Sequence, residues 1–534
     1  MTAVRFKIAS EASEIEQVHR LNHATFAEEI PQHPRSADGL LVDRFHDQNT
    51  YVIALDGDRV VGMLAVRTDR PFSLDTKVLD LDSHLPPGRS VCEVRLLGVR
   101  SEHRKGTVFR GLMRLVTQHC LSLGFDTAVI SGTVRQLKLY GHMGFKPFGP
   151  LVGTPEAQYQ PMYLTLEDAR ERWKAFEPEK VRLQPGPVSL HPGVRRAFAA
   201  PPISHRCGEF AGMLREVKAR LRELVGAERV SLLFGSGTLA NDAVAAQISH
   251  EGGAGVILAN GEFGERLCDH AGRFGLAHSA LRTEWGSAFD YERVDDLAAQ
   301  PDCEWVWAVH CETSTGVLND LDALRDLCRH RGRRLYLDCI SSIGTVPVSL
   351  DGVRLASGVS GKGLGSFAGI SMVFHDHAIA PAPGLPRYLD LGCYGREDEV
   401  PYTVCSNLVA ALRAALRRQR FEERFSHLAG LASWLRAALR DQGLRILAPD
   451  AHASPAVTTI VLPPEVDSYR VGCALEERGY ELSYSSSYLR ERGWIQICLM
   501  GEHGREELAL LPRLLRDAVA EFPLRSPYPS VSHI

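Results

Sequence analysis

From residue 184 onward the chain alternates short apolar runs with longer helical patterns, and this alternation limits the possible folds more than any other feature. Five apolar runs are expected to be strands, at 231–234, 256–259, 305–309, 335–338 and 370–374. Near-continuous apolar strands belong in a mostly parallel sheet that helices cover on both faces. We therefore expect a large α/β domain over 183–430 and a smaller α/β domain over 431–534, with strands at 457–462 and 494–499.

Length and composition fit a multidomain globular protein. The chain has 534 residues, more than a single domain usually contains, so two or three domains are expected. Lys and Arg number 61 against 65 Asp and Glu, and a net charge of −4 gives no basic surface for nucleic acid or membrane. The 12 cysteines form no CxxC pair, which predicts reduced thiols and neither a disulfide framework nor a metal site. The N-terminal stretch has no signal-peptide core and no run could span a membrane, so a soluble, cytoplasmic protein is expected.

One lysine stands in a stretch of small residues, SGVSGKGLGSFAGIS at 357–371. Glycine lacks the Cβ that would block a planar ligand, so such a loop lets a ligand approach the backbone closely. In a partly dry pocket the charged form of Lys362 is disfavoured, and its amine becomes nucleophilic near neutral pH. That chemistry suits a Schiff base with pyridoxal phosphate, PLP. Taken alone, however, the stretch favours a surface lysine in a flexible glycine loop.

Three upstream segments favour the cofactor interpretation. FGSGTLA at 234–240 follows an expected strand and opens a helix, so Ser236, Gly237 and Thr238 would present backbone N–H groups to a phosphate. Asp338 ends the strand at 335–338, where a carboxylate can pair with a protonated pyridine nitrogen; the alternative is a helix cap or a turn. ETSTG at 312–316 places a polar cluster after another strand.

In this order and spacing the segments resemble the class V, fold type I, PLP-dependent aminotransferases. The resemblance is greatest to the branch that holds 2-aminoethylphosphonate–pyruvate and alanine–glyoxylate or serine–pyruvate transaminases, and it covers most of 183–525. The matching stretches are collinear: LQPGP at 183–187, FGSGTLA at 234–240, GEFGERL at 261–267, ETSTG at 312–316, YLDCISSIG at 336–344 and SGVSGKGLGSFAGIS at 357–371.

The resemblance implies roles for residues at the matching positions. Lys362 would form the Schiff base and then move a proton at the α-carbon of the substrate, while Asp338 would hold the pyridinium. Gly237 and Thr238 would receive the phosphate, with Ser236 beside them, and Phe263 would stack on the cofactor ring; its alternative is a core phenylalanine.

Further positions follow from the same resemblance. Thr313 or Ser314 would contact the ring hydroxyl, and Ser360 lies just ahead of the lysine. Tyr402 and Thr403 match a segment that, in this family, reaches across a dimer interface to the phosphate of the other subunit. The resemblance therefore implies a homodimer.

One position departs from the family pattern. Family transaminases place an arginine near the C-terminal end to bind the substrate carboxylate bidentately, and Gln496 stands there in WIQICLMG at 494–501. Arg490 or Arg492 in the preceding loop could replace that arginine. If they do not, we expect a substrate other than an ordinary α-amino acid/α-keto acid pair, and the alternative chemistry is that of a PLP-dependent lyase or decarboxylase.

Residues 1–170 are expected to form a separate α/β domain, followed by a charged linker over 171–182. The pattern predicts helices at 15–24, 108–123 and 134–142 and strands at 50–55, 60–67, 91–99 and 127–130. EVRLLGVRSEHRKG at 93–106 and LKLYGHMGF at 137–145 resemble a GNAT-fold N-acyltransferase. The segment 26–64 is more similar to the N-acyl amino acid synthase and acyl-homoserine-lactone synthase branch, which takes acyl chains from acyl carrier protein.

The GNAT resemblance implies an acyl-donor site at the turn after the central strand. That turn would bind acyl-CoA or acyl carrier protein through four residues, Arg104, Lys105, Gly106 and Thr107. It departs from the family pattern because Phe109 stands where a small residue would admit a diphosphate. Glu93 is predicted as general base and Tyr140 as the proton donor to the leaving thiolate, with a surface ion pair and a core tyrosine as alternatives.

Together these observations predict a bifunctional biosynthetic enzyme. Its PLP-dependent part would transaminate a small amine or amino acid with a keto-acid or aldehyde partner, and its N-terminal part would acylate an amine. The alternatives are a PLP-dependent lyase whose GNAT-like domain is a non-catalytic interaction platform, and a non-catalytic scaffold built from two decayed enzymes.

Overall fold

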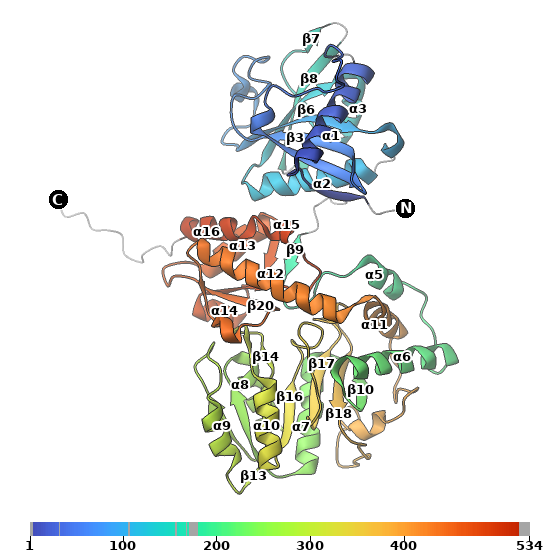
Figure 1. Ribbon diagram of the computed structural model, residues 1–534, viewed down its shortest axis with the longest axis vertical. Coiled ribbons are helices and arrows are strands. Elements are labelled where there is room, and N and C mark those ends of the chain that lie inside the picture. Colours follow the sequence, from blue (N-terminus) through green and yellow to red (C-terminus); the bar gives the residue numbers. More distant parts are fainter. Residues whose placement is uncertain are drawn as a thin grey trace, which may run out of the picture. The chain divides into compact units, whose positions relative to one another are not determined.

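The computed structural model describes residues 4–30, 32–104, 107–154, 157–166, 168–169 and 180–522, which belong to two compact units (Figure 1). The first unit comprises Met1–Lys180 with Glu477–Gly479, and the second comprises Val181–Glu476 with Tyr480–Ile534. Each unit has its own hydrophobic core.

The first unit is built on one mixed sheet in the order β1-β2-β3-β4-β5-β8-β6, with β7 paired to β8. Strands β4 and β5 are parallel, and the other neighbours are antiparallel. The strands are β1 Arg5–Ile8, β2 Asn49–Asp56, β3 Arg59–Arg67, β4 Val91–Val99, β5 Thr127–Thr133, β6 Lys146–Pro147, β7 Val152–Thr154 and β8 Ala157–Thr165.

Successive side chains of a strand point to opposite faces of the sheet. In this sheet both faces are apolar, so helices cover both. Val52 and Ala54 of β2 pack with helix α2 (Thr107–Ser122), while Ile53 and Leu55 pack with helix α1 (Ala12–His23). A bulge interrupts β4 at Leu96, which has a positive φ of 54°. The short helix α3 (Leu137–Met143) follows β5. The elements predicted for this part of the sequence are present, with ends that differ by up to three residues.

The second unit contains a seven-stranded sheet in the order β10-β18-β17-β16-β13-β11-β12. Its central strands are parallel, and β18 is antiparallel to both of its neighbours. The strands are β10 Arg229–Leu233, β11 Ala254–Ala259, β12 His278–Arg282, β13 Cys303–Val309, β16 Arg334–Asp338, β17 Leu355–Val359 and β18 Ser371–His375. The expected mostly parallel sheet is thus confirmed, and two strands, β12 and β17, were not predicted.

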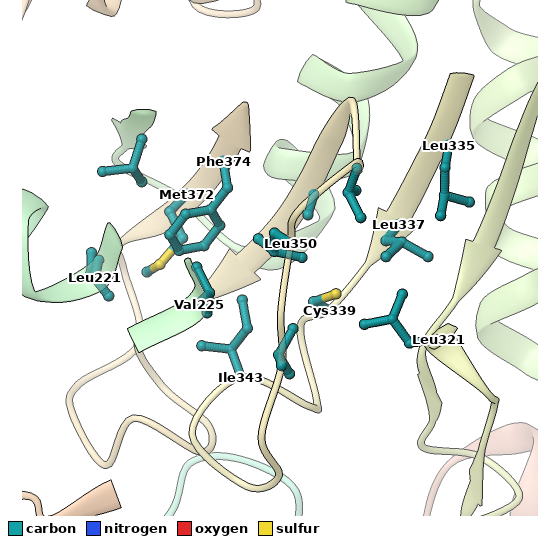
Figure 2. Close-up of a cluster of buried hydrophobic side chains, with 14 of the residues drawn as sticks. Leu221, Val225, Leu321, Leu335, Leu337, Cys339, Ile343, Leu350, Met372 and Phe374 are labelled. Atoms are coloured by element: carbon teal, nitrogen blue, oxygen red, sulfur yellow. The ribbon is translucent and has the colours of Figure 1, made fainter. Parts of the chain in front are cut away.

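Both faces of this sheet are covered by helices, as Figure 1 shows. On one face Leu335, Leu337 and Phe374 pack against apolar side chains of α6, α9 and α10, and Figure 2 shows part of that cluster. On the other face Trp305 and Trp307 pack against α7 and α8. The helices are α6 Gly208–Val225, α7 Gly237–Glu251, α8 Glu262–Arg273, α9 Tyr291–Ala298 and α10 Leu321–Arg331.

The C-terminal part of the second unit has a smaller antiparallel sheet in the order β19-β20-β22 (Arg445–Ile446, Val457–Val461 and Trp494–Cys498). The segment β9 (Val181–Leu183) runs parallel to β21 (Tyr480–Leu482), so the first residues of this unit are paired with its last part. Further helices are α5 Pro192–Phe198, α11 Ser406–Arg418, α12 Phe421–Asp441, α13 Ser468–Glu477, α14 Ser487–Arg492, α15 Arg505–Leu508 and α16 Leu511–Glu521. Among the described residues, no helix is long and apolar enough to cross a membrane.

Candidate active site

A cavity of about 440 Å³ lies at the carboxyl ends of β13, β16 and β17, beside the N-terminus of α7. Ligands of open α/β sheets bind at this end of the strands, and the volume suits a small cofactor with its substrate. Most of the residues predicted to bind the cofactor are brought together here. The predicted residues that line it are Ser236, Gly237, Thr238, Phe263, Thr313, Asp338 and Lys362.

Lys362 stands in the cavity on the loop between β17 and β18. Its Nζ donates a hydrogen bond to the Ser341 hydroxyl at 3.0 Å and lies 5.4 Å from the centroid of the Phe263 ring. The Ser341 hydroxyl also shares a short hydrogen bond with the Thr313 hydroxyl. Burial lowers the pKa of Lys362, while the Asp338 carboxylate acts in the opposite direction. The amine is therefore easier to deprotonate than an exposed lysine.

Asp338 lies at the last position of β16, and its side chain is buried. Its carboxylate accepts hydrogen bonds from Asn241 Nδ2 at 2.8 Å and from the backbone N–H of Ile340 at 2.9 Å. Burial raises the pKa of Asp338, and these two hydrogen bonds and Lys362 counteract the rise. Asn241 thus orients an acid that faces the cavity.

The N-terminus of α7 forms another wall, with Ser236 at the cap position and Gly237 and Thr238 in the first turn. Backbone N–H groups and the helix dipole at this end favour an anion such as a phosphate. A Cβ at Gly237 would come within 2.7 Å of Ile340 Cδ1, so a larger residue would displace a side chain of the cavity wall.

Phe263 is held in place by Glu312, which has no exposed surface. The Glu312 carboxylate accepts hydrogen bonds from the backbone N–H groups of Phe263 and Gly264 in the first turn of α8, at 3.1 and 3.0 Å. Ser314 donates to the same carboxylate at 2.5 Å and accepts from the N–H of Glu262 at 2.9 Å. Of the two candidates for the ring hydroxyl, Thr313 therefore faces the cavity, while Ser314 braces α8.

Three other predicted cofactor ligands lie away from the cavity lining. The Ser360 hydroxyl donates to the Phe367 carbonyl at 2.6 Å, which closes the lysine loop on itself. Tyr402 and Thr403 line a second pocket of about 400 Å³, in which the Tyr402 ring stacks on Tyr388 at 4.3 Å. That pocket also includes Gly235, the residue before Ser236 at the N-terminus of α7.

The residues predicted to recognise the substrate are engaged elsewhere. Gln496 has no exposed surface, and its Nε2 lies 2.6 and 2.9 Å from the carbonyls of Thr313 and Ser314. The guanidinium of Arg492 lies 3.7 Å from the Trp285 ring centroid, and that of Arg490 lies over another aromatic ring. Gln496 therefore joins the small sheet to the loop that follows β13.

The cavity fits PLP. A lysine, a buried carboxylate, an aromatic ring and a helix N-terminus stand on its walls, and each matches a different part of that cofactor. The Oδ1 atom of Asn241, at the same wall, is buried without a hydrogen-bond partner. When bound, PLP would be held by Lys362, Asp338, Phe263 and the first turn of α7.

In the first unit, Glu93 is fully buried on β4. Its carboxylate accepts hydrogen bonds from Ser73 N at 2.7 Å, Ser73 Oγ at 2.5 Å and Leu74 N at 3.2 Å, and Arg95 Nε lies 3.6 Å away. These donors occupy both carboxylate oxygens, so Glu93 anchors the 73–74 turn. Its role as a general base stays a prediction.

Tyr140 lies on α3 with its ring against Gly132 and Phe145. Burial raises the pKa of Tyr140, which keeps its hydroxyl protonated as a proton donor must be. Arg104, predicted to bind the acyl donor, instead forms two hydrogen bonds with the Glu29 carboxylate at 2.6 and 2.5 Å. Lys105 and Gly106 lie outside the described residues, and Thr107 begins α2.

Sequence reasoning missed several residues of the cavity. Asn241 stands one helical turn after Gly237, and this spacing places it on the same face of the helix. Ser341 stands three residues after Asp338, in the turn that follows β16. Cys311 and His270 also line the cavity, and His270 Nδ1 lies 2.7 Å from Asp242. Nothing local in the sequence marks these two, because their neighbours are distant in the chain.

Comparison with known proteins finds relatives for both units. A family model described as N-acyl amino acid synthase FeeM matches residues 17–167. The soluble hydrogenase 42 kDa subunit of Anabaena cylindrica is 32% identical over 306 residues, which cover 54% of this chain and 79% of the relative. The alanine–glyoxylate aminotransferase of Oryctolagus cuniculus is 27% identical over 395 residues, 69% of this chain and 96% of the relative.

The chain is also similar to solved structures of aminotransferases. The crystal structure of aspartate aminotransferase, subgroup IV, from Thermus thermophilus superposes with a TM-score of 0.59 at 30% identity. The match covers 64% of this chain and 99% of that chain.

Proposed function

Because the chain belongs to the class V PLP-dependent aminotransferases and carries an N-acyl amino acid synthase domain at residues 17–167, we propose that it is a bifunctional biosynthetic enzyme. The second unit transfers an amino group between a small amine or amino acid and a keto acid or aldehyde. The first unit joins an acyl group to an amine. Tethering the two activities raises the effective concentration of an amine made by one unit at the site of the other.

The observation that carries the proposal is the position of Lys362 in a cavity shared with Asp338 and the N-terminus of α7. PLP supplies an electron sink for the carbon that carries the amino group. Lys362 Nζ, whose pKa is lowered by burial, removes the proton from that carbon of the donor, and in the second half-reaction it adds a proton to the former carbonyl carbon of the acceptor. Ser341, 3.0 Å away, orients the amine.

The remaining cavity residues would bind and orient the cofactor. Asp338, held by Asn241, is the partner for a protonated ring nitrogen, and the N–H groups of Gly237 and Thr238 are the partners for a phosphate. Phe263 covers one face of a planar ring and excludes water from it. Its backbone is fixed by Glu312, so this face is preorganised.

We extend the proposal to assembly, acyl donor and location. Tyr402 and Thr403 border a pocket next to Gly235, which suits a homodimer in which they approach the phosphate of the other subunit. The acyl donor, acyl-CoA or acyl carrier protein, would bind near residues 104–107. All 12 cysteines are free, which is consistent with the reducing cytoplasm.

The first test is the visible spectrum of the purified protein beside a Lys362→Ala variant. We expect a cofactor absorbance in the wild type that the variant lacks, and its bleaching by one class of amino donor. A wild-type protein that takes up no PLP would contradict the proposal. If the cofactor is bound but no donor bleaches its absorbance, transamination is contradicted and PLP binding is not.

The second test concerns the first unit. The full chain is incubated with a panel of amines and amino acids and with either acyl-CoA or acyl carrier protein loaded with acyl chains. Formation of an N-acyl product is followed by mass spectrometry. No product with either donor would show that the bifunctional form of the proposal is wrong.

A further inference from the structure

Among the described residues that line it, the cavity around Lys362 has no buried arginine for a substrate carboxylate. Among its described lining residues, the basic ones are Lys362, Arg266 and His270. Arg266 pairs with Glu262 at 3.0 Å and lies 4.8 Å from the Phe263 ring centroid, on the side of the cofactor-stacking residue. His270 is paired with an aspartate, and Lys362 is the reacting amine.

Strand β22 contributes a neutral residue whose hydrogen bonds are all used. The Nε2 of Gln496 has three acceptors, the carbonyls of Thr313 and Ser314 and the hydroxyl of Thr459 at 2.9 Å. Its Oε1 accepts a hydrogen bond from the Tyr488 hydroxyl at 3.2 Å. An amide N–H₂ group has two hydrogens, so none remains for a ligand.

Beyond Gln496, strand β22 continues into a buried apolar cluster. Two residues after Gln496, Cys498 packs into a buried cluster with four other apolar residues, Val188, Ala456, Val457 and Met500. Cys311 lines the same cavity as Lys362. Burial raises the pKa of Cys311 to about 11, so this thiol is neutral at physiological pH.

The two arginines of the preceding loop do not compensate. Arg492 is stacked on Trp285, and Arg490 lies 5.1 Å from the Tyr469 ring centroid. Neither is among the residues that line the cavity. A carboxylate taken into this site would therefore find no buried guanidinium to compensate for its lost hydration.

We infer that the amino donor and acceptor of this site are a primary amine and an aldehyde or ketone without a carboxylate on the reacting carbon. The inference rests on the proposed transamination. In the overall reaction the donor carbon loses its amino group and a hydrogen and is oxidised by two electrons to a carbonyl. The acceptor carbonyl is reduced by the same two electrons to an amine, so no external oxidant or reductant is needed.

The test uses the holoenzyme and pairs of donors that differ only by the carboxylate: ethylamine with alanine, 3-methylbutylamine with leucine, and phenylethylamine with phenylalanine. The rate of loss of the cofactor absorbance is measured for each. We expect the amine of at least one pair to react more than about tenfold faster than its amino acid, equivalent to 1.4 kcal/mol. Faster reaction of the amino acid in every pair would overturn the inference and leave transamination intact. No conversion by either class would overturn both.

A binding measurement gives a readout apart from turnover. Calorimetric titration of the holoenzyme with propanoate should show no binding at millimolar concentrations. Gln496→Arg should bind propanoate, and the neutral, similarly sized Gln496→Met should not. If Gln496→Arg does not fold, the wild-type titration still decides, because tight propanoate binding there would contradict a site without a carboxylate partner.

Discussion

The ε-amino group of Lys362 donates a hydrogen bond to the Ser341 hydroxyl at 3.0 Å, and the same hydroxyl shares a short hydrogen bond with Thr313. Three loops meet in this chain of polar groups: the one after β13, the one after β16 and the one after β17. The reactive amine is thus fixed by residues that belong to different strand ends. This arrangement gives the first prediction.

Ser341→Ala should slow the half-reaction of the holoenzyme about tenfold, the equivalent of one net hydrogen bond, because Lys362 loses the group that orients it. Cofactor binding should change little, since Ser341 does not belong to the proposed phosphate or ring-nitrogen sites. Ser342→Ala is the matched control, because the neighbouring hydroxyl donates only to the Cys339 carbonyl. Stopped-flow absorbance measures both, and equal rates in the two variants would contradict the orienting role.

Asn241→Ala should raise the pH below which the protein loses its cofactor. The Asn241 hydrogen bond lowers the pKa of Asp338, which burial raises, so its loss raises that pKa further and the carboxylate becomes protonated at a higher pH. Cofactor remaining after dialysis is measured from pH 5 to 8. Gln247→Ala on the same helix, whose amide donates only to the Leu389 carbonyl, should leave the profile unchanged.

Asp338→Asn should make Lys362 of the cofactor-free chain react with an amine-selective reagent at lower pH. The Asp338 carboxylate raises the pKa of Lys362, so its removal allows deprotonation at a lower pH. The reaction is followed by mass spectrometry of the peptide that contains Lys362. A shift to higher pH would show that the two groups are not electrostatically coupled as described.

Much of this arrangement is visible in the sequence, because strand-terminal polar residues lie next to apolar runs. The Lys362 loop and Asp338 stand out in this way. Strand β17, Leu355–Val359, does not, because Ser357 and Gly358 resemble the glycine-rich loop that follows. The edge strand β12 is only partly buried and lacks a clear apolar pattern.

Positions whose partners are distant in the chain could not be predicted. Gln496 contacts carbonyls 183 and 182 residues away, so the sequence does not reveal that its amide joins the small sheet to the loop that follows β13. The same holds for Glu312, which caps a helix that begins 50 residues earlier in the sequence. Such contacts depend on how the loops meet in three dimensions.

Glu312→Ala should lower the free energy of unfolding of the second unit by about 2–4 kcal/mol, because the buried N–H groups of Phe263 and Gly264 lose their acceptor. Glu262→Ala, which removes a partly exposed ion pair with Arg266 on the same helix, should cost no more than about 0.5 kcal/mol. Chemical denaturation of the two variants, followed by tryptophan fluorescence, makes the comparison. Equal stability would mean that another group replaces the cap.

Glu93→Gln should destabilise the first unit by about 2 kcal/mol, because one carboxylate oxygen that accepts from the 73–74 turn becomes a donor facing donors. Glu102→Gln, at an exposed ion pair with Arg59, is the control and should leave stability unchanged. Thermal unfolding and the pH profile of acyl transfer are measured together. A positioning role predicts lower stability with an unchanged profile, whereas loss of the acidic limb, the fall in rate at low pH, at full stability would identify Glu93 as the general base.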